Sequence, residues 1–316
     1  MLIGAFSFFG CRANCGLVLR VYSGNWSKGM IRFTKMQGLG NDYLLIDAMK
    51  EAPPEEKLAA IARALSDRHF GIGADGIILV EPSRVADFKM RIFNSDGSEA
   101  GMCGNGVRLF ARFVYEQGYT REREMEIETN SRIVRPRLRM RGNRITGVRV
   151  DMGEPHLRRS EIPMKGPDQE QVVGERVRVL GKRFKFTAVS MGNPHCVIFV
   201  DDLDTVKLEE FGPALEHHEL FPERTNVEFA QVLGEGDIRM RVWERGAGET
   251  LACGTGASAV VVAGVLNELT SRRALVHLLG GDLKVHWNRE GNRVFIEGPA
   301  ETICTGETHL DEGMRP

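Results

Sequence analysis

Two cysteines, Cys103 and Cys253, lie in two copies of one sequence motif. The first copy is DFKMRIFNSDGSEAGMCGNG at residues 87–106, and the second is DIRMRVWERGAGETLACGTG at residues 237–256. Aligned without a gap, the copies share an Asp, a Met-Arg pair, a Glu and a Cys-Gly-x-Gly segment, with every pair 150 positions apart (253 − 103). A motif repeated at constant spacing indicates a duplicated domain with one thiol in each copy.

The position of each cysteine suggests acid–base chemistry. Each one precedes a Gly-x-Gly segment at the predicted start of a helix, where unpaired backbone N–H groups can bind a carboxylate and lower a thiol pKa. Two such halves packed face to face would hold a substrate α-carbon between Cys103 and Cys253. One thiolate could remove the α-proton while the other thiol returns a proton to the opposite face, and the N–H groups would stabilise the developing negative charge.

This scheme needs no metal, pyridoxal phosphate or nucleotide, and the sequence has no motif for any of them. The glycine-rich segment RHFGIGADG at residues 68–76 opens no predicted helix, so we do not interpret it as a nucleotide site. We therefore expect a reaction without a cofactor. Free cysteines are usually buried and inert, and we accept that interpretation for Cys196 and Cys304. For Cys103 and Cys253 the repeated glycine-flanked context argues against it.

Other polar residues are candidates for the same cleft. His195, after a Gly-Asn-Pro turn, and Glu244, at a strand end, could adjust the proton affinity of a thiol, although a structural histidine and a solvated Glu-Arg pair are the simpler readings. Four asparagines lie at predicted turns or strand ends: Asn41, Asn94, Asn193 and Asn226. Asparagine is common in turns, and this preference alone would explain their positions. If their side chains converged on a cleft, they would suit a substrate with carboxylate and ammonium groups at both ends.

Bulk properties agree with a two-domain protein of 316 residues. A net charge of −1 gives no indication of nucleic acid or an anionic membrane as partner. Six scattered cysteines do not form a disulfide framework, so we expect a reducing, cytoplasmic protein. Residues 1–30 have no sustained periodicity and no secretory signal pattern, and we interpret them as an extension or as a start assigned too early.

The hydrophobic pattern predicts an α/β (α+β) protein with more strand than helix in each half. Helices are predicted over residues 105–117, ended by Gly118, and over residues 257–269, which are apolar nearly all round and so should be buried. The Pro-, Gly- and charge-rich passage at residues 152–171 is the expected crossing between the halves.

With these residues in view, the chain closely resembles the diaminopimelate epimerase family. The resemblance extends from about Ile31 to the C-terminus and rests on five segments in order: FTKMQGLGNDYLLID, FNSDGSEAGMCGNG, SMGNPHC, FPERTNVEF and ERGAGETLACGTG. It implies two pseudo-symmetric domains, each a strongly curved, largely antiparallel sheet round a central helix, with the active site between them. The implied first domain is residues 31–149 with 302–316, because the C-terminal strand returns to it, and the second is residues 150–301.

The resemblance also implies a function. It predicts cofactor-independent interconversion of L,L- and meso-diaminopimelate, in lysine and peptidoglycan synthesis, by a homodimer. It assigns Cys103 and Cys253 as the acid–base pair, and His195 and Glu244 as modulators of the thiol pKa values. The implied substrate contacts are Asn41, Asn94, Gly104, Asn105, Asn193, Asn226, Glu244, Arg245, Gly254 and Thr255. Gly76 stands where some members of the family have Gln.

Three alternatives remain open on the sequence. The fold could racemise another amino acid such as proline or catalyse a phenazine-type isomerisation, although two retained cysteines argue against the latter. The chain could be an amino-acid-binding module that does not catalyse proton exchange. It could also be a thiol redox protein, although it contains no Cys-x-x-Cys segment.

Overall fold

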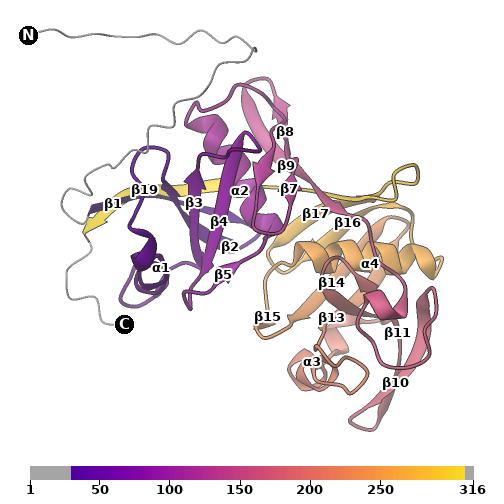
Figure 1. Cartoon of the computed structure of the whole chain (residues 1–316). Coiled ribbons are helices and arrows are strands. Elements are labelled where there is room, and N and C mark those ends of the chain that lie inside the picture. Colours follow the sequence, from indigo (N-terminus) through magenta and orange to yellow (C-terminus); the bar gives the residue numbers. More distant parts are fainter. Residues whose placement is uncertain (1–29, 310–316) are drawn as a thin grey trace, which may run out of the picture.

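Two open β-sheets, each curved around one helix, form the protein in a computed structural model that describes residues 30–309 (Figure 1). The expected extension lies outside the described residues except for Met30, which opens the first strand. Residues 310–316 also lie outside them. Among residues 30–309, no helix is long and apolar enough to span a membrane.

The first sheet has eight strands in the order β19-β1-β2-β3-β4-β6-β7, with β5 paired to β4. Its strands are β1 (Met30–Gly38), β2 (Asn41–Asp47), β3 (Gly76–Glu81), β4 (Phe88–Asn94), β5 (Glu99–Ala100), β6 (Ile127–Glu128), β7 (Ile133–Val134) and β19 (Glu301–His309). Strand β19, near the chain end, pairs antiparallel with β1 along its length and so lies in the first sheet (Figure 1).

The second sheet has eleven strands in the order β10-β11-β12-β13-β14-β16-β17-β18-β9-β8, with β15 paired to β14. Its strands are β8 (Arg137–Arg141), β9 (Arg144–Gly153), β10 (Val172–Val179), β11 (Lys182–Ser190), β12 (Pro194–Phe199), β13 (Asn226–Gly234), β14 (Asp237–Glu244), β15 (Gly248–Glu249), β16 (Arg273–Leu278), β17 (Gly281–Trp287) and β18 (Val294–Gly298). Strands β8 and β9 precede the second motif in sequence but extend this sheet, because β9 pairs with β18.

The two sheets repeat one topology. In each, all neighbouring strands are antiparallel except at two places, β2–β3 and β4–β6 in the first sheet and β12–β13 and β14–β16 in the second. The registers also correspond, since Tyr43 pairs with Gly76 in the first sheet and His195 pairs with Asn226 in the second. The predicted α+β class and the duplication are therefore confirmed.

The helices follow the same repeat. Helices α1 (Leu58–Ser66) and α3 (Leu208–Glu216) are each nine residues long, and the central helices α2 (Gly104–Glu116) and α4 (Gly254–Leu266) are each thirteen. Gly118 ends α2 with φ = 78°, as predicted, and Glu268 adopts φ = 60° at the equivalent place after α4. Short 3₁₀ turns lie at Glu55–Lys57, Arg159–Glu161 and Leu203–Thr205.

Both central helices lie within one continuous hydrophobic core, which also takes side chains from both sheets. Arg108 and Arg112 of α2 attach the chain that leaves the second sheet: the Arg108 Nε donates to the Pro299 carbonyl at 3.0 Å, and Arg112 donates to the Ala300 carbonyl. The chain therefore crosses back to the first sheet over the side of α2. This core holds the two helix starts in a fixed relation.

Leu109 of α2 is fully buried in this core, and its truncation tests how far the core determines stability. Leu109→Ala should lower the free energy of unfolding by about 2–5 kcal/mol. The variant loses the transfer free energy of the removed methyl and methylene groups and also leaves a cavity in the core. Leu233→Ala, at a side chain that is 49% exposed, should change it by less than about 0.5 kcal/mol. Urea denaturation would measure both; equal values would contradict the described core.

Candidate active site

Cys103 is the N-cap of α2. Its backbone is extended (φ −135°), and its sulfur accepts a hydrogen bond from the Gly106 N–H at 3.4 Å. The thiol is partly exposed, and no acidic residue occupies the first turn of α2, so the positive end of the helix dipole is not neutralised there. The predicted placement of this thiol at a helix start is confirmed.

Cys253 has the same arrangement at the start of α4. Its φ is −127°, and its sulfur accepts from the Gly256 N–H at 3.3 Å, again without an acidic residue in the first turn. Cys253 is more buried than Cys103, with 5% of its surface exposed. The two thiols thus have matching backbone geometry but different access to solvent.

The two helix starts meet the same pair of side chains. A Cβ placed on Gly104 would lie 3.2 Å from the Met152 Cε and 3.5 Å from the Ile296 Cδ1. A Cβ on Gly254 would lie 3.2 Å from the same Ile296 Cδ1 and 3.9 Å from the same Met152 Cε. The Cβ positions of Gly104 and Gly254 therefore lie no further apart than the sum of their distances to the Ile296 Cδ1. This shared contact brings the residues after both thiols to one place between the sheets.

Asn41 and Tyr43 of β2 surround the Cys103 thiol. The Tyr43 hydroxyl lies 3.8 Å from the sulfur, and the thiol lies 3.7 Å from the Asn41 Oδ1. The Asn41 amide donates to the Asp75 Oδ2 at 2.6 Å, which fixes its orientation. Burial, together with the neighbouring Cys103, raises the pKa of Tyr43 well above its ordinary value, so the phenol stays protonated and can donate to the sulfur.

His195 and Asn193 approach the second thiol through Thr255. The His195 ring, fully buried in β12, has its Nε2 3.0 Å from the Asn193 Oδ1. The Asn193 Nδ2 donates to the Thr255 Oγ1 at 3.4 Å, and this oxygen lies 3.4 Å from the Cys253 sulfur. The structure therefore brings three of the predicted residues together around Cys253.

Glu244 ends β14 beside the same thiol. Its carboxylate accepts a hydrogen bond from the Thr250 hydroxyl. Burial raises the pKa of Glu244, although hydrogen bonds from Thr250 and Cys253 act in the opposite direction. Burial also raises the pKa of the Cys253 thiol well above its ordinary value, and the negative charges of Glu244 and Glu228 add to this. At neutral pH Cys253 is therefore a thiol.

Asn226 and Arg245 are joined to each other. The Asn226 amide donates to the Pro194 carbonyl at 2.8 Å and accepts from the Arg245 backbone N–H at 2.9 Å. Asn226 thus ties β12, β13 and the loop after β14 together. The Arg245 guanidinium is exposed and donates to the Glu223 carbonyl at 3.1 Å.

The other predicted residues lie at the Cys103 end. Asn94, at the end of β4, pairs with Gly76 across the sheet and donates to the Ser98 hydroxyl at 3.0 Å. Asn105 is buried, and its Oδ1 has no hydrogen-bond partner among the described residues. At Gly76 a Cβ would lie only 2.2 Å from the Phe93 carbonyl oxygen, so this backbone has no room for the Gln of some relatives.

The sequence interpretation missed Glu228 and Arg108. Glu228 of β13 is fully buried, with its Oε1 2.6 Å from the His195 Nδ1. Arg108 of α2 is also fully buried, and burial lowers its pKa to about 10. The repeat contained the signal for both, because the equivalent residues 150 positions away are Ile78 and Ser258. A charge in one copy of a core position and a neutral residue in the other marks a functional difference between the halves.

These charges make the two thiol environments unlike. Arg108 and the thiolate form of Cys103 attract each other, whereas Cys253 has the carboxyl groups of Glu228 and Glu244 beside it. Negative neighbours favour the thiol form of Cys253. The backbone repeat is therefore symmetric, while the electrostatics of the two thiols are not.

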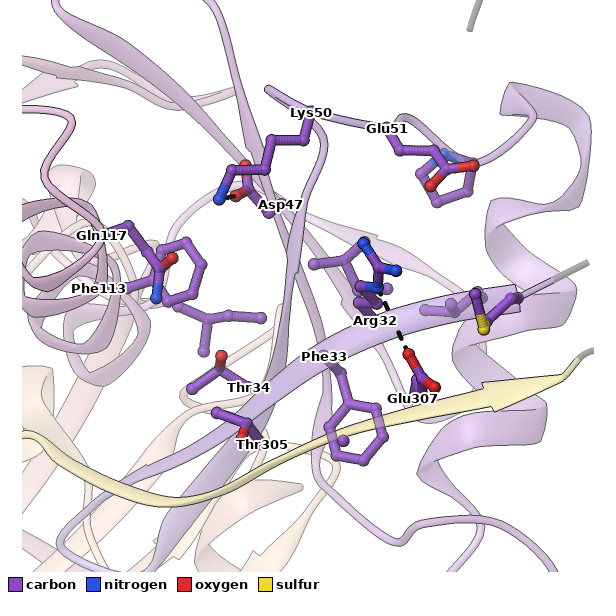
Figure 2. Close-up of a pocket in the computed structure, with 16 residues that line it drawn as sticks. Arg32, Phe33, Thr34, Asp47, Lys50, Glu51, Phe113, Gln117, Thr305 and Glu307 are labelled. Atoms are coloured by element: carbon purple, nitrogen blue, oxygen red, sulfur yellow. Dashed lines mark hydrogen bonds and ion pairs between the residues drawn. The ribbon is translucent and has the colours of Figure 1, made fainter. Parts of the chain in front are cut away.

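A separate cavity of about 470 Å³ lies over β1, β2 and β19 at the far end of α2 (Figure 2). Phe33, Phe113 and Gln117 contribute to its wall, and the Arg32–Glu307 pair at 3.4 Å borders it. Cys103 and Gln117 cap opposite ends of α2, which at 1.5 Å per residue separates them by roughly 20 Å. This cavity is therefore not part of the thiol site.

Comparison with known proteins agrees with this geometry. The family model described as diaminopimelate epimerase matches residues 33–158 and 187–303. The diaminopimelate epimerase of Moorella thermoacetica is 53% identical over 281 residues, covering 89% of this chain and all of the relative. That of Pelotomaculum thermopropionicum is 54% identical over 277 residues, covering 88% of this chain and 98% of the relative.

The chain belongs to the diaminopimelate epimerase family. It is therefore an isomerase of the epimerase class. Solved structures share the fold at low identity. A hydroxyproline epimerase from Agrobacterium vitis has a TM-score of 0.65 at 16% identity, covering 92% of this chain and 95% of that one. A PhzF-family phenazine biosynthesis protein from Bacillus anthracis has a TM-score of 0.64 at 18% identity, covering 89% and 99%.

The raised pKa of Cys253 predicts its reactivity towards alkylating agents, because only the thiolate reacts. The rate of Cys253 labelling by iodoacetamide should rise with pH through a midpoint above that of free cysteine measured in parallel. Peptide mass spectrometry after timed quenching would give the rate at each pH. A midpoint at or below that of free cysteine would contradict the described carboxylate environment.

Proposed function

We propose that this protein interconverts L,L- and meso-diaminopimelate without a cofactor, with Cys103 and Cys253 as the acid–base pair. The observation that carries the proposal is the contact of both helix starts with Met152 and Ile296, directly after the two thiols. Membership of the diaminopimelate epimerase family supports the choice of substrate. The hydrogen-bond donors and acceptors around both thiols support a small polar substrate.

In the proposed reaction the substrate α-carboxylate lies against the first N–H groups of α2 and α4. A thiolate at Cys103 takes the α-proton, the electron pair passes into the carboxylate, and the thiol of Cys253 donates its proton to the opposite face of the carbon. The centre is inverted, Cys103 ends as a thiol and Cys253 as a thiolate, and the reverse reaction exchanges these states. The raised pKa of Cys253 supports this direction because it keeps that proton available.

We propose that the polar residues of both halves hold the two ends of the substrate. Asn94 at the end of β4, Asn105 in the first turn of α2 and Thr255 in the first turn of α4 would contact the substrate. Arg245 is exposed and could pair with the distal carboxylate, while Asn226 would act through the backbone of its loop. His195 and Glu244 would adjust the second thiol. Asn41, Asn193 and the amides of Gly104 and Gly254 complete the proposed binding surface.

The remaining family expectations are part of the proposal. Two domains would act around the substrate, as expected, but the boundary expected after residue 149 moves to before β8, because β8 and β9 belong to the second sheet. The protein would be a cytoplasmic homodimer in lysine and peptidoglycan synthesis. The four cysteines among the described residues are all free thiols, which supports a reducing compartment.

Proton NMR of L,L-diaminopimelate in D₂O with reductant tests this function. The wild-type protein should convert the substrate to the meso isomer with loss of the α-proton signal and no added cofactor. Cys103→Ala and Cys253→Ala should each lower the rate by at least about 10²–10⁴-fold, the usual contribution of one acid or base. Cys304→Ala, at an exposed thiol of β19, is the matched control and should keep the wild-type rate.

Near-normal turnover by either cysteine variant would contradict the two-thiol reaction. A wild-type preparation that exchanges proline or another amino acid, but not diaminopimelate, would instead favour the racemase alternative on this fold.

A further inference from the structure

Glu228 is a buried carboxyl group in an apolar strand. It lies between Val227 and Phe229 of β13, and none of its side chain is exposed. Burying such a group is costly unless it is hydrogen-bonded, and its Oε1 lies 2.6 Å from the Nδ1 of the fully buried His195. Its Oε2 has no hydrogen-bond partner among the described residues. All of its polar contact is therefore made to one ring nitrogen of His195.

A chain of hydrogen bonds leads from Glu228 to Cys253. The His195 Nε2 contacts the Asn193 Oδ1 at 3.0 Å, the Asn193 Nδ2 donates to the Thr255 Oγ1 at 3.4 Å, and that oxygen lies 3.4 Å from the sulfur. An amide oxygen only accepts, so the proton of this first bond belongs to Nε2. Because Thr255 already accepts from Asn193, its own hydroxyl proton is free to point at the sulfur. Every donor along the chain is directed towards Cys253.

The proton count of the His195–Glu228 pair is also determined. Two acceptor atoms cannot lie 2.6 Å apart without a proton between them, so one proton is shared by Nδ1 and Oε1 in addition to the proton on Nε2. Replacing Glu228 by any neutral residue removes a negative charge that raises the pKa of the Cys253 thiol, so donor direction is isolated by comparing two neutral variants with each other.

The first half supports its thiol with different residues. Ile78 occupies the position equivalent to Glu228, and its Cδ1 approaches the Gly106 Cβ position to 3.1 Å, as the Glu228 Oε1 approaches that of Gly256 to 2.8 Å. Tyr43 replaces His195, and its hydroxyl contacts the Cys103 sulfur directly. The same fold thus supports Cys103 with Tyr43 and with Asn41, which is itself held by Asp75, and supports Cys253 with a chain of four residues.

We propose that Glu228 is a positioning residue, which keeps the proton of His195 on Nε2 and thereby directs the Thr255 hydroxyl to the Cys253 sulfur. This inference rests on the proposed function, in which Cys253 exchanges a proton with substrate. Glu228 itself does not contact the substrate. Without a partner at Nδ1, a neutral imidazole can carry its proton on either nitrogen. With the proton on Nδ1, the Asn193 amide would turn to donate to Nε2, and Thr255 would donate to its oxygen instead of the sulfur.

Two variants separate the effect of the hydrogen-bond direction between His195 and Cys253 from the effect of the Glu228 carboxyl group itself. Glu228→Ile installs the residue of the first half and removes the partner of Nδ1. Glu228→Gln retains a partner, because its NH₂ group can donate to Nδ1 and so keep the proton on Nε2. The readout is the iodoacetamide labelling rate of Cys253 between pH 7 and 10, with the exposed Cys304 as internal reference.

Loss of a hydrogen bond to the thiolate should make Cys253 label about tenfold more slowly in Glu228→Ile than in Glu228→Gln at neutral pH, because both variants lack the Glu228 charge and only Glu228→Gln keeps the proton on Nε2. Labelling of Cys103 and Cys304 should be the same in both variants. Equal Cys253 labelling in the two folded variants would overturn the proposal. Equal slowing at Cys103 would also overturn it, because that would indicate a general loosening of the fold.

Nitrogen-15 NMR of the wild-type protein provides a test that needs no variant to fold. The His195 Nε2, assigned with His195→Asn, should have the chemical shift of a protonated ring nitrogen; an unprotonated Nε2 would overturn the proposal. Neither measurement uses substrate. A failed diaminopimelate assay with the expected labelling and NMR results would therefore reject the proposed function alone, and the reverse outcome would reject only the role of Glu228.

Discussion

The structure depends on one constraint, which is that two buried helices begin at the same place. Helices α2 and α4 lie in a common core, and the residues after their N-caps contact the same Met152 and Ile296 side chains. Each N-cap is a cysteine whose sulfur accepts the N–H of the last glycine of the Cys-Gly-x-Gly segment. Because both sheets curve around these helices, the thiols cannot move apart without disrupting the core.

Duplication explains the geometry of the site but not its chemistry. A reaction that removes a proton on one side and adds one on the other needs a base and an acid at equivalent positions. The two copies supply this by differing in a few buried residues. Arg108 lies near Cys103 where the second copy has Ser258, and Glu228 lies near Cys253 where the first copy has Ile78. The fold thus provides symmetric placement, and these substitutions make the two thiols chemically different.

Much of this was accessible from the sequence, because the repeat is strong. The constant spacing of the repeat identified Cys103 and Cys253 as equivalent residues. The glycines and the periodicity of apolar residues predicted the helices that follow the two cysteines. The family resemblance also predicted that the last strand returns to the first domain. Strand β9 shows the limit, since its pairing with β18 depends on contacts about 150 residues apart that no local pattern specifies, and β8 joins the sheet through β9.

The hydrogen-bond partners were less accessible. A histidine after a turn predicts a polar site, but only the packing of β12 against β13 brings the His195 ring to Glu228. Likewise, Asn226 was expected as a substrate contact, and its amide is bonded to the backbone at Pro194 and Arg245. Such partners depend on tertiary register, in which a shift of one residue would turn each side chain to the other face of the sheet.

The isotopic content of the first product formed in D₂O tests the central claim most directly. With two thiols on opposite sides of the carbon, early meso-diaminopimelate should carry deuterium at its inverted α-carbon, while the unreacted L,L-substrate keeps its proton. The incoming hydrogen would come from the second thiol, which exchanges with solvent between turnovers. Early product that retains the original proton would show that a single group transfers it across the carbon, and would contradict this account.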